Sequence, residues 1–184
     1  MSVVDPSSAA AGRPQVPMDG WYNDRARHGG ADAVPLPNGG RLWLCGKHFV
    51  GPDPDAALAA VGASAVVCLN QRSELVDRYP HYVEWLRTQA PLRAVWFPIP
   101  DLGAPHLDAA TELLESLCQR VERGDTLLVH CGAGIGRAGT IAAGLLMALG
   151  SGAADALALV AAHRPMAGPE AGAQRDLIAA LVAP

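Results

Sequence analysis

Residues 127–140 read LLVHCGAGIGRAGT, and this stretch decides how the rest of the chain is interpreted. An apolar run ends in His130 and Cys131, a glycine-rich segment containing Arg137 follows, and another apolar run begins near Gly139. This order predicts a buried strand, a tight loop and the start of a helix. In open α/β sheets ligands bind beyond the carboxyl ends of the strands, and Cys131 lies at such an end.

The sequence on both sides of this stretch alternates between predicted strands and predicted helices. The predicted strands are short and apolar, whereas the predicted helices carry apolar residues at helical spacing or are bounded by Gly and Pro. Strands are expected at 41–46, 64–70, 93–100 and 125–131, and helices at 53–63, 74–89, 107–124, 139–150, 153–164 and 169–182. The alternation predicts an α/β fold in which a central, mainly parallel sheet of four to five strands is flanked by helices.

The N-terminal residues differ from the rest in composition. Residues 1–20 are rich in Pro, Ala, Ser and Gly, which is typical of a flexible tail. Residues 21–40 contain Trp21 and Tyr22 followed by Gly and Pro, and they are expected to form an N-terminal extension. A chain of 184 residues suits one domain, which we expect at residues 41–184.

Composition argues against several classes of protein. The formal net charge is −4 and no segment is polybasic, so neither nucleic acid nor a membrane surface is an expected partner. The N-terminus lacks the pattern of a signal peptide, and the apolar stretch from Ile141 is broken by glycines and Asp155, so no membrane span is expected. The chain has 4 cysteines without CxxC or His-containing ligand spacing, which argues against a metal site and favours a reducing, cytoplasmic setting.

Three interpretations compete for the glycine-rich loop. A Walker A loop requires Gly-Lys-Ser/Thr, which is missing. Residues 134–139 match the GxGxxG pattern of dinucleotide-binding folds, but only helices are predicted after them, where that fold needs another strand. The third interpretation joins Cys131 and Arg137 in an anion site, in which loop amides point inward beside a helix N-terminus. An inert, buried Cys131 in a glycine turn is the remaining alternative.

The third interpretation gives each side chain a chemical task. Arg137 offers a planar fork that can bind two phosphate oxygens. An anion site also stabilises a thiolate, so Cys131 is expected to be a nucleophile. The predicted arrangement is a reactive sulfur beneath a bound phosphoryl group.

Residues 130–137 (HCGAGIGR) resemble the signature loop of the cysteine-dependent protein tyrosine phosphatases, and most closely the HCxxGxxR loop of their dual-specificity branch. The resemblance implies a protein tyrosine phosphatase-like fold with a catalytic domain at 41–184 and no metal ion or other cofactor. It implies that Cys131 attacks phosphorus, that Arg137 and the loop backbone bind the phosphoryl group, and that His130 orients the loop. The loop residues concerned are Gly132, Ala133, Gly134, Ile135 and Gly136.

Members of this superfamily use an Asp on a separate loop to protonate the leaving group, and residues 98–105 (PIPDLGAP) resemble that loop. Asp101 follows a predicted strand, so it is also expected near the carboxyl edge of the sheet. A role for Asp101 in forming a turn is the alternative. Asp108 precedes an apolar helical segment and better suits a helix N-cap.

Four further positions have roles that the resemblance implies. Gln174 matches the Gln that positions the hydrolytic water in many tyrosine phosphatases, with a solvated helix position as the alternative. Ala138 departs from most of the family, which has Ser or Thr after the arginine, and resembles the phosphatases of regenerating liver. Thr140 is not expected to replace the missing hydroxyl. Cys68 is a candidate for a reversible disulfide with Cys131, although a buried apolar role is expected first.

The sequence therefore predicts a cytoplasmic phosphatase that acts on phosphorylated proteins or small phosphomonoesters through a phosphocysteine. The loop carries no lysine, which favours a singly phosphorylated substrate. Phosphopeptide binding with slow or no turnover is the alternative that Ala138 favours. Rhodanese-like and arsenate reductase-like enzymes also place a reactive Cys in an anion loop, but they would not predict the Asp101 loop.

Overall fold

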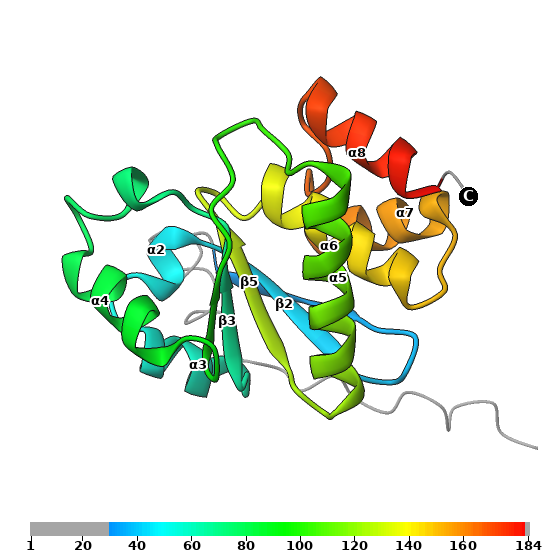
Figure 1. The fold of residues 1–184 in the computed structure, drawn as a ribbon. Helices are drawn as coiled ribbons and strands as arrows, with labels where there is room; N and C mark the ends of the chain where they lie inside the picture. Colours follow the sequence, from blue (N-terminus) through cyan, green and yellow to red (C-terminus); the bar gives the residue numbers. More distant parts are fainter. Residues whose placement is uncertain (1–29, 183–184) are drawn as a thin grey trace, which may run out of the picture.

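The computed structural model describes residues 30–182, and within them a sheet lies between two layers of helices (Figure 1). The strand order across the sheet is β1-β2-β5-β3-β4. The strands are β1 (Ala31–Pro35), β2 (Arg41–Gly46), β3 (Ala65–Cys68), β4 (Ala94–Trp96) and β5 (Leu127–Cys131). Every neighbouring pair is parallel except β1 with β2. The predicted α/β fold with a mainly parallel sheet is confirmed.

The edge strand β1 is a feature that the sequence analysis did not predict. It lies in residues 21–40, which were assigned to an N-terminal extension, and it pairs with β2 from Ala31 opposite Cys45 to Pro35 opposite Arg41. A tight turn joins the two strands, in which Gly39 has a φ of 84°. The predicted boundary at Arg41 therefore cuts through a hairpin of the sheet. The predicted tail at 1–20, with Trp21 and Tyr22, lies outside the described residues.

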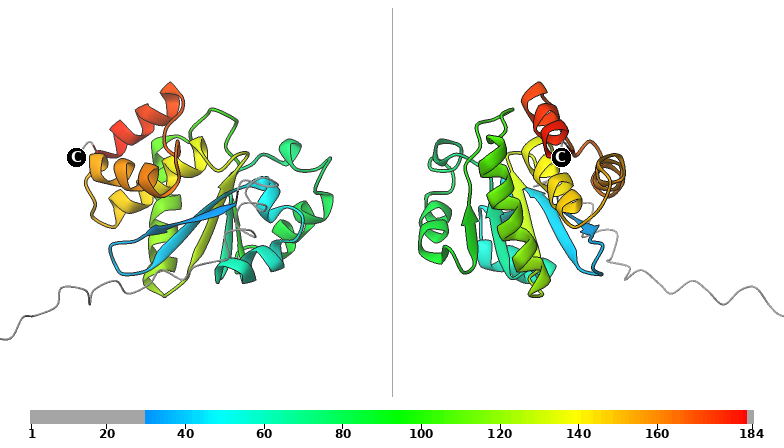
Figure 2. Two further views of the ribbon diagram at one scale, coloured as in Figure 1. Left: turned by 180° about the vertical axis from the view of Figure 1, so that it is seen from behind. Right: turned by 45° about the vertical axis from the view of Figure 1, so that its right-hand side comes forward.

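The helices cover the two faces of the sheet, as the two views in Figure 2 show. One face carries the later helices, and its core contains Leu114, Leu117, Ile141 and Leu145. The other face carries the earlier helices, and its core contains Leu58, Tyr82 and Leu86. The helices of the first face are α5 (Leu107–Glu122), α6 (Gly136–Ala148), α7 (Ala153–His163) and α8 (Gly172–Val182); those of the second are α2 (Lys47–Val50), α3 (Pro54–Val61), the 3-10 turn η1 (Arg72–Glu74) and α4 (Pro80–Gln89).

The central strand β5 sends alternate side chains into the two cores. Leu127, Val129 and Cys131 belong to the core beneath α5 and α6. Leu128 belongs to the opposite core, beneath α3 and α4. This alternation follows from the period of two in a strand. It directs Cys131 to the side of the sheet where α6 begins.

Local signals explain most helix boundaries. Asp53 accepts a hydrogen bond from the amide of Ala56 and caps α3, and Gly62 ends that helix in the left-handed conformation. The helical segment expected at 74–89, with an interruption at Pro80, is a helix only from that residue on, because Pro80 occupies the first turn of α4 and cannot continue a preceding helix. The predicted N-cap role of Asp108 is wrong: His106 is the N-cap of α5, and Asp108 lies in its first turn. No helix within residues 30–182 is both long enough and apolar enough to cross a bilayer.

Candidate active site

The loop between β5 and α6 is held at both ends by regular structure. Cys131 is the last residue of β5, and Gly46 on β2 is its register partner. Lys47, which follows Gly46, donates its backbone N–H to the carbonyl of Gly132 at 3.0 Å. Arg137 lies in the first turn of α6. The nucleophile candidate and the arginine are thus fixed by two adjoining elements.

Close packing explains the glycines of the loop. Gly134 has a φ of 74°, and a Cβ there would collide with the carbonyl of Cys45. A Cβ on Gly136 would collide with the Glu170 carboxylate, and one on Gly139 would collide with the backbone of Gly168. The loop therefore needs glycine both for its backbone conformation and for close approach.

Arg164 holds the outer side of this loop. Its Nε donates to the carbonyl of Gly134 at 2.7 Å, and its Nη2 donates to the carbonyl of Ala133 at 2.8 Å. Its Nη1 pairs with Asp32 of β1 at 2.7 Å. In a trans peptide the N–H points opposite to the C=O, so the amides that follow these carbonyls, those of Gly134 and Ile135, point away from Arg164. The hairpin that the sequence analysis missed thus supports the loop through Asp32.

A cavity of about 340 Å³ opens over the loop. It brings together most of the predicted site residues, although their positions in the sequence are far apart. The predicted residues that line it are Asp101, Cys131, Gly132, Ala133, Gly136, Arg137 and Gln174. Gly134 and Ile135 do not line it, because Gly134 packs against Cys45 and the Ile135 carbonyl accepts from Gly139 and Gly168. Cys131 is a free thiol that is only 3% exposed and is nevertheless among the residues that line the cavity.

Arg137 is bound by two carboxylates. Its Nη1 and Nη2 each donate to one oxygen of Glu74 at 2.8 Å, and Nη1 also donates to the carbonyl of Ile99 at 2.8 Å. Burial alone would raise the pKa of Glu74, but the hydrogen bonds and charge of Arg137, together with hydrogen bonds from the Gln71 amide and Asn70, lower that pKa to about 2. Burial alone would lower the pKa of Arg137, but the bound Glu74 carboxylate, with the nearby Cys131 and Asp101, raises it. The Arg137 guanidinium and the Glu74 carboxylate therefore form a fixed ion pair in which both groups are charged.

Asp101 reaches the same guanidinium from the opposite loop. Its Oδ1 lies 3.0 Å from Arg137 Nη2, and its side chain is 74% exposed. The loop turns tightly after it, since Gly103 donates its N–H to the carbonyl of Pro100 at 2.9 Å. Asp101 and Cys131 thus line one cavity, as the resemblance of the two loops implied.

Gln174 connects the Asp101 loop to the start of α8. Its Oε1 accepts the backbone N–H of Glu170 at 2.8 Å, and its Nε2 donates to the carbonyl of Gly103 at 3.2 Å. The side chain is only 1% exposed, which excludes the alternative of a solvated helix residue. Gln174 faces the cavity with one further hydrogen and one further lone pair.

The other predicted supporting residues are buried around the loop. The Thr140 hydroxyl donates to the Gly136 carbonyl at 2.7 Å, so it is engaged within α6. Ala138 is fully buried next to Arg137. His130 shares a 2.6 Å hydrogen bond between its Nε2 and the Tyr82 hydroxyl. Burial lowers the pKa of His130 to about 4, so the ring is neutral near pH 7.

Cys68 starts on the opposite face of the sheet from Cys131. It pairs in register with His130 and belongs to the core beneath α4, where His130 contacts Tyr82. Burial raises the pKa of Cys68 to about 12, which keeps it a thiol. The reversible disulfide with Cys131 stays a prediction.

Sequence reasoning missed several residues of the cavity. Lys47, Glu74, Leu102 and Glu170 also line it. A signal for Lys47 was present, because it directly follows a strand and so lies at the carboxyl edge of the sheet. Glu74 lacked such a signal, since its contact with Arg137 joins residues 63 positions apart.

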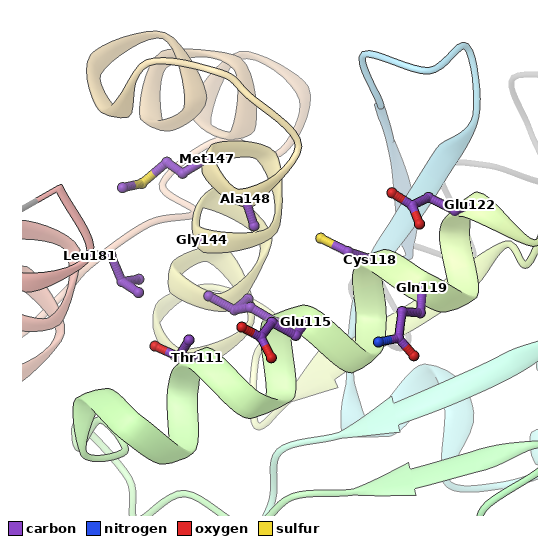
Figure 3. Close-up of a pocket in the computed structure, with 10 residues that line it drawn as sticks. Thr111, Glu115, Cys118, Gln119, Glu122, Gly144, Met147, Ala148 and Leu181 are labelled. Carbon is purple, nitrogen blue, oxygen red and sulfur yellow. The ribbon is translucent and has the colours of Figure 1, made fainter. Parts of the chain in front are cut away.

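A second and larger hollow lies elsewhere, between α5, α6 and α8 (Figure 3). Its volume is about 480 Å³, and Glu115, Cys118, Met147 and Leu181 are among the residues that line it. None of the predicted site residues lines this hollow.

Comparison with known proteins agrees with the geometry. A family model described as "Swiss Army Knife protein, DSP-PTPase phosphatase domain" matches residues 47–177. The crystal structure of Tk-PTP in its active form is 29% identical, with a TM-score of 0.63 over 77% of this chain and 91% of that chain. No curated protein matches the sequence.

Two more distant structures share the fold. Kinase associated phosphatase, solved with its catalytic-site cysteine replaced by serine, is 21% identical, with a TM-score of 0.68 over 81% of this chain and 91% of that chain. Human DUSP28 is 20% identical, with a TM-score of 0.61 over 82% of this chain and 91% of that chain.

Proposed function

Because the chain belongs to the family described as Swiss Army Knife protein, DSP-PTPase phosphatase domain, we propose that it is a phosphatase acting through a phosphocysteine without a metal ion. The proposed substrates are phosphotyrosine, phosphoserine and phosphothreonine in proteins, and small phosphomonoesters. The observation that carries the proposal is one cavity lined by Cys131, Arg137 and Asp101. A cytoplasmic location is part of the proposal, because the cysteines of the described residues are free thiols.

In the first step the Cys131 sulfur attacks phosphorus. The S–P bond forms as the P–O bond to the leaving group breaks, and Asp101 donates a proton to the leaving oxygen. Arg137 and the loop amides stabilise the negative charge on the remaining phosphoryl oxygens.

In the second step water attacks the phosphocysteine. A new P–O bond forms as the S–P bond breaks, and Asp101, now a carboxylate, accepts a proton from the water. Inorganic phosphate leaves and the thiolate is restored. Gln174 supports this step, because it lines the cavity and bridges the Asp101 loop and the Glu170 backbone.

Substrate binding requires an exchange of partners at Arg137. Asp101 Oδ1 lies 3.0 Å from Nη2, where a phosphoryl oxygen is expected to bind. The exposed Asp101 side chain can move to the leaving-group side, while Glu74 keeps its two hydrogen bonds to the guanidinium. Arg137 therefore stays oriented during the exchange.

The Asp101→Asn variant tests the proposed acid. An amide cannot protonate the leaving oxygen, so kcat/KM for phenyl phosphate, which reports formation of the phosphocysteine, is expected to fall by about 10²-fold to 10³-fold. For p-nitrophenyl phosphate, whose leaving group needs little protonation, the fall is expected to be smaller. Steady-state assays in EDTA measure both. The control is Asp108→Asn, which makes the same charge change in the first turn of α5. Its steady-state rates with both substrates are expected to stay within about twofold of those of the unmodified protein. Equal losses for the two substrates would contradict the assignment.

The Ala138→Ser variant tests the second step. A hydroxyl next to Arg137 can donate to the departing sulfur, so steady-state kcat is expected to rise about 2-fold to 10-fold. Rapid mixing with p-nitrophenyl phosphate should show a burst of about one equivalent in the unmodified protein and a reduced burst in the variant. Ala142→Ser, one helical turn further on, is the matched control and should leave the burst unchanged. An unaltered burst and rate in Ala138→Ser would refute the idea.

A second function, phosphopeptide binding with slow or no turnover, is favoured by one observation. Ala138 is fully buried and Thr140 donates to Gly136, so these two positions offer no hydroxyl to the sulfur. The burst experiment separates the two functions, since a binding protein releases no p-nitrophenol while a slow enzyme releases one equivalent.

A further inference from the structure

The charges that line the active-site cavity leave a bound phosphate short of positive partners. Two cations, Lys47 and Arg137, face three acidic side chains: Glu74, Glu170 and Asp101, which carries a proton in the proposed first step. Arg137 is already paired with both oxygens of Glu74. A phosphate monoester adds close to two negative charges at neutral pH, and an attacking thiolate adds one more. The paired Arg137 alone cannot balance them.

Lys47 is fixed beside the loop by its own backbone. It follows Gly46, the register partner of Cys131, and its N–H donates to the Gly132 carbonyl at 3.0 Å. It lines the cavity, and its Nζ donates to the backbone carbonyl of Glu74 at 3.0 Å. An ammonium group has three donors, so two remain after this bond.

Lys47 also differs from Arg137 in its partners. Within residues 30–182 no carboxylate forms an ion pair with Lys47, whereas Arg137 pairs with Glu74 and Asp101. The Lys47 charge is therefore available to an incoming anion. Its bond to the Glu74 carbonyl keeps it near the guanidinium that Glu74 orients.

We infer that Lys47 is a substrate-contacting residue that binds the phosphoryl group from beside the signature loop. Lys47 supplies positive charge to the bound phosphoryl group, whereas the charge of Arg137 is already balanced by Glu74. The inference rests on the proposed function and adds to it a phosphate ligand from the β2–α2 junction, outside the two loops that the sequence singled out.

Binding of inorganic phosphate tests the inference apart from catalysis. The protein is used in the Cys131→Ser background, and phosphate affinity is measured by calorimetry at fixed ionic strength. Lys47→Gln is expected to weaken binding about 10-fold to 100-fold, because a charge-assisted hydrogen bond is lost. Lys47→Arg is expected to stay within about threefold, because it keeps the charge. Lys47→Met, which keeps the aliphatic stem, repeats the test should the Gln variant unfold.

Arg72→Gln is the matched control. Arg72 is an exposed cation two residues before Glu74, and it does not line the cavity. The substitution makes the same change in net charge, so it is expected to alter phosphate affinity less than about twofold. An equal loss in Arg72→Gln, or an unchanged affinity in Lys47→Gln and Lys47→Met, overturns the inference but leaves the proposed function standing. Failure of the Cys131→Ser protein with Lys47 intact to bind phosphate overturns both.

Discussion

The Cys131→Ser variant is expected to lose about 10⁴-fold or more of kcat/KM toward p-nitrophenyl phosphate while keeping its fold. A thiolate is a strong nucleophile, whereas a serine hydroxyl requires a neighbouring base to remove its proton. His130 cannot serve as that base, because its ring packs on the opposite side of the sheet, with Nε2 on the Tyr82 hydroxyl. Removing a group on which covalent catalysis depends costs most of the rate enhancement.

The measurement is a steady-state assay in EDTA with a parallel thermal melt. Ser and Cys are close in size, so the melting temperature is expected to change little. Cys118→Ser is the matched control, because Cys118 lies on α5 and lines the separate hollow of Figure 3. It should retain full activity. Activity above about 1% of the unmodified protein in Cys131→Ser would exclude a phosphocysteine, since background hydrolysis is far slower.

The parts of the fold that the sequence predicted depend on local signals. The strand predicted at 125–131 is β5 at 127–131, and the helix predicted from Gly139 begins at Gly136, because an apolar run followed by glycines leaves few other choices. β1 was missed for the opposite reason. Its sequence, ADAVP, ends in proline and has only Val34 as a buried apolar residue. Its stability comes from pairing with β2 and from the Asp32–Arg164 ion pair, which joins residues 132 positions apart. No sequence window contains such information.

The site residues also divide into those that local sequence signals reveal and those that only tertiary contacts reveal. Cys131, the loop and Arg137 could be found because their chemistry depends on a short, fixed spacing. Asp101 and Gln174 required the family resemblance, and the structure brings both to the cavity. Glu74 and Arg164 act through tertiary contacts, so only the folded structure showed them at the loop. Lys47 follows a strand, which was a usable signal, but its bond to the Glu74 carbonyl also required the fold. A buried charge such as Arg164 looks like an ordinary surface arginine in a sequence.

Replacing Arg137 by lysine is expected to lower kcat by about 10³-fold although the charge is kept. Lysine lacks the planar fork, so it cannot bind Glu74 through two parallel hydrogen bonds and hold the phosphoryl oxygens at the same time. Losses of 10²-fold to 10⁵-fold are about what removing one transition-state donor or an arginine produces in related chemistry. Arg175→Lys, on α8 and outside the cavity, is the matched control and should be within about twofold.

The free energy of unfolding separates the structural role of Arg137, which is to bind Glu74 and Ile99, from its proposed role in binding the phosphoryl group. In Arg137→Lys the Ile99 carbonyl and the Glu74 carboxylate, both inside the site, lose donors, so unfolding is expected to become easier by about 1–3 kcal/mol. Adding Glu74→Gln removes the unpaired carboxylate and should restore part of that stability, yet it should not restore kcat, because the missing contacts are those to the phosphoryl group. Denaturant melts and steady-state rates on the two single variants and the double variant test this. Recovery of kcat in the double variant would mean that Arg137 only neutralises Glu74, and that the anion is bound by other groups.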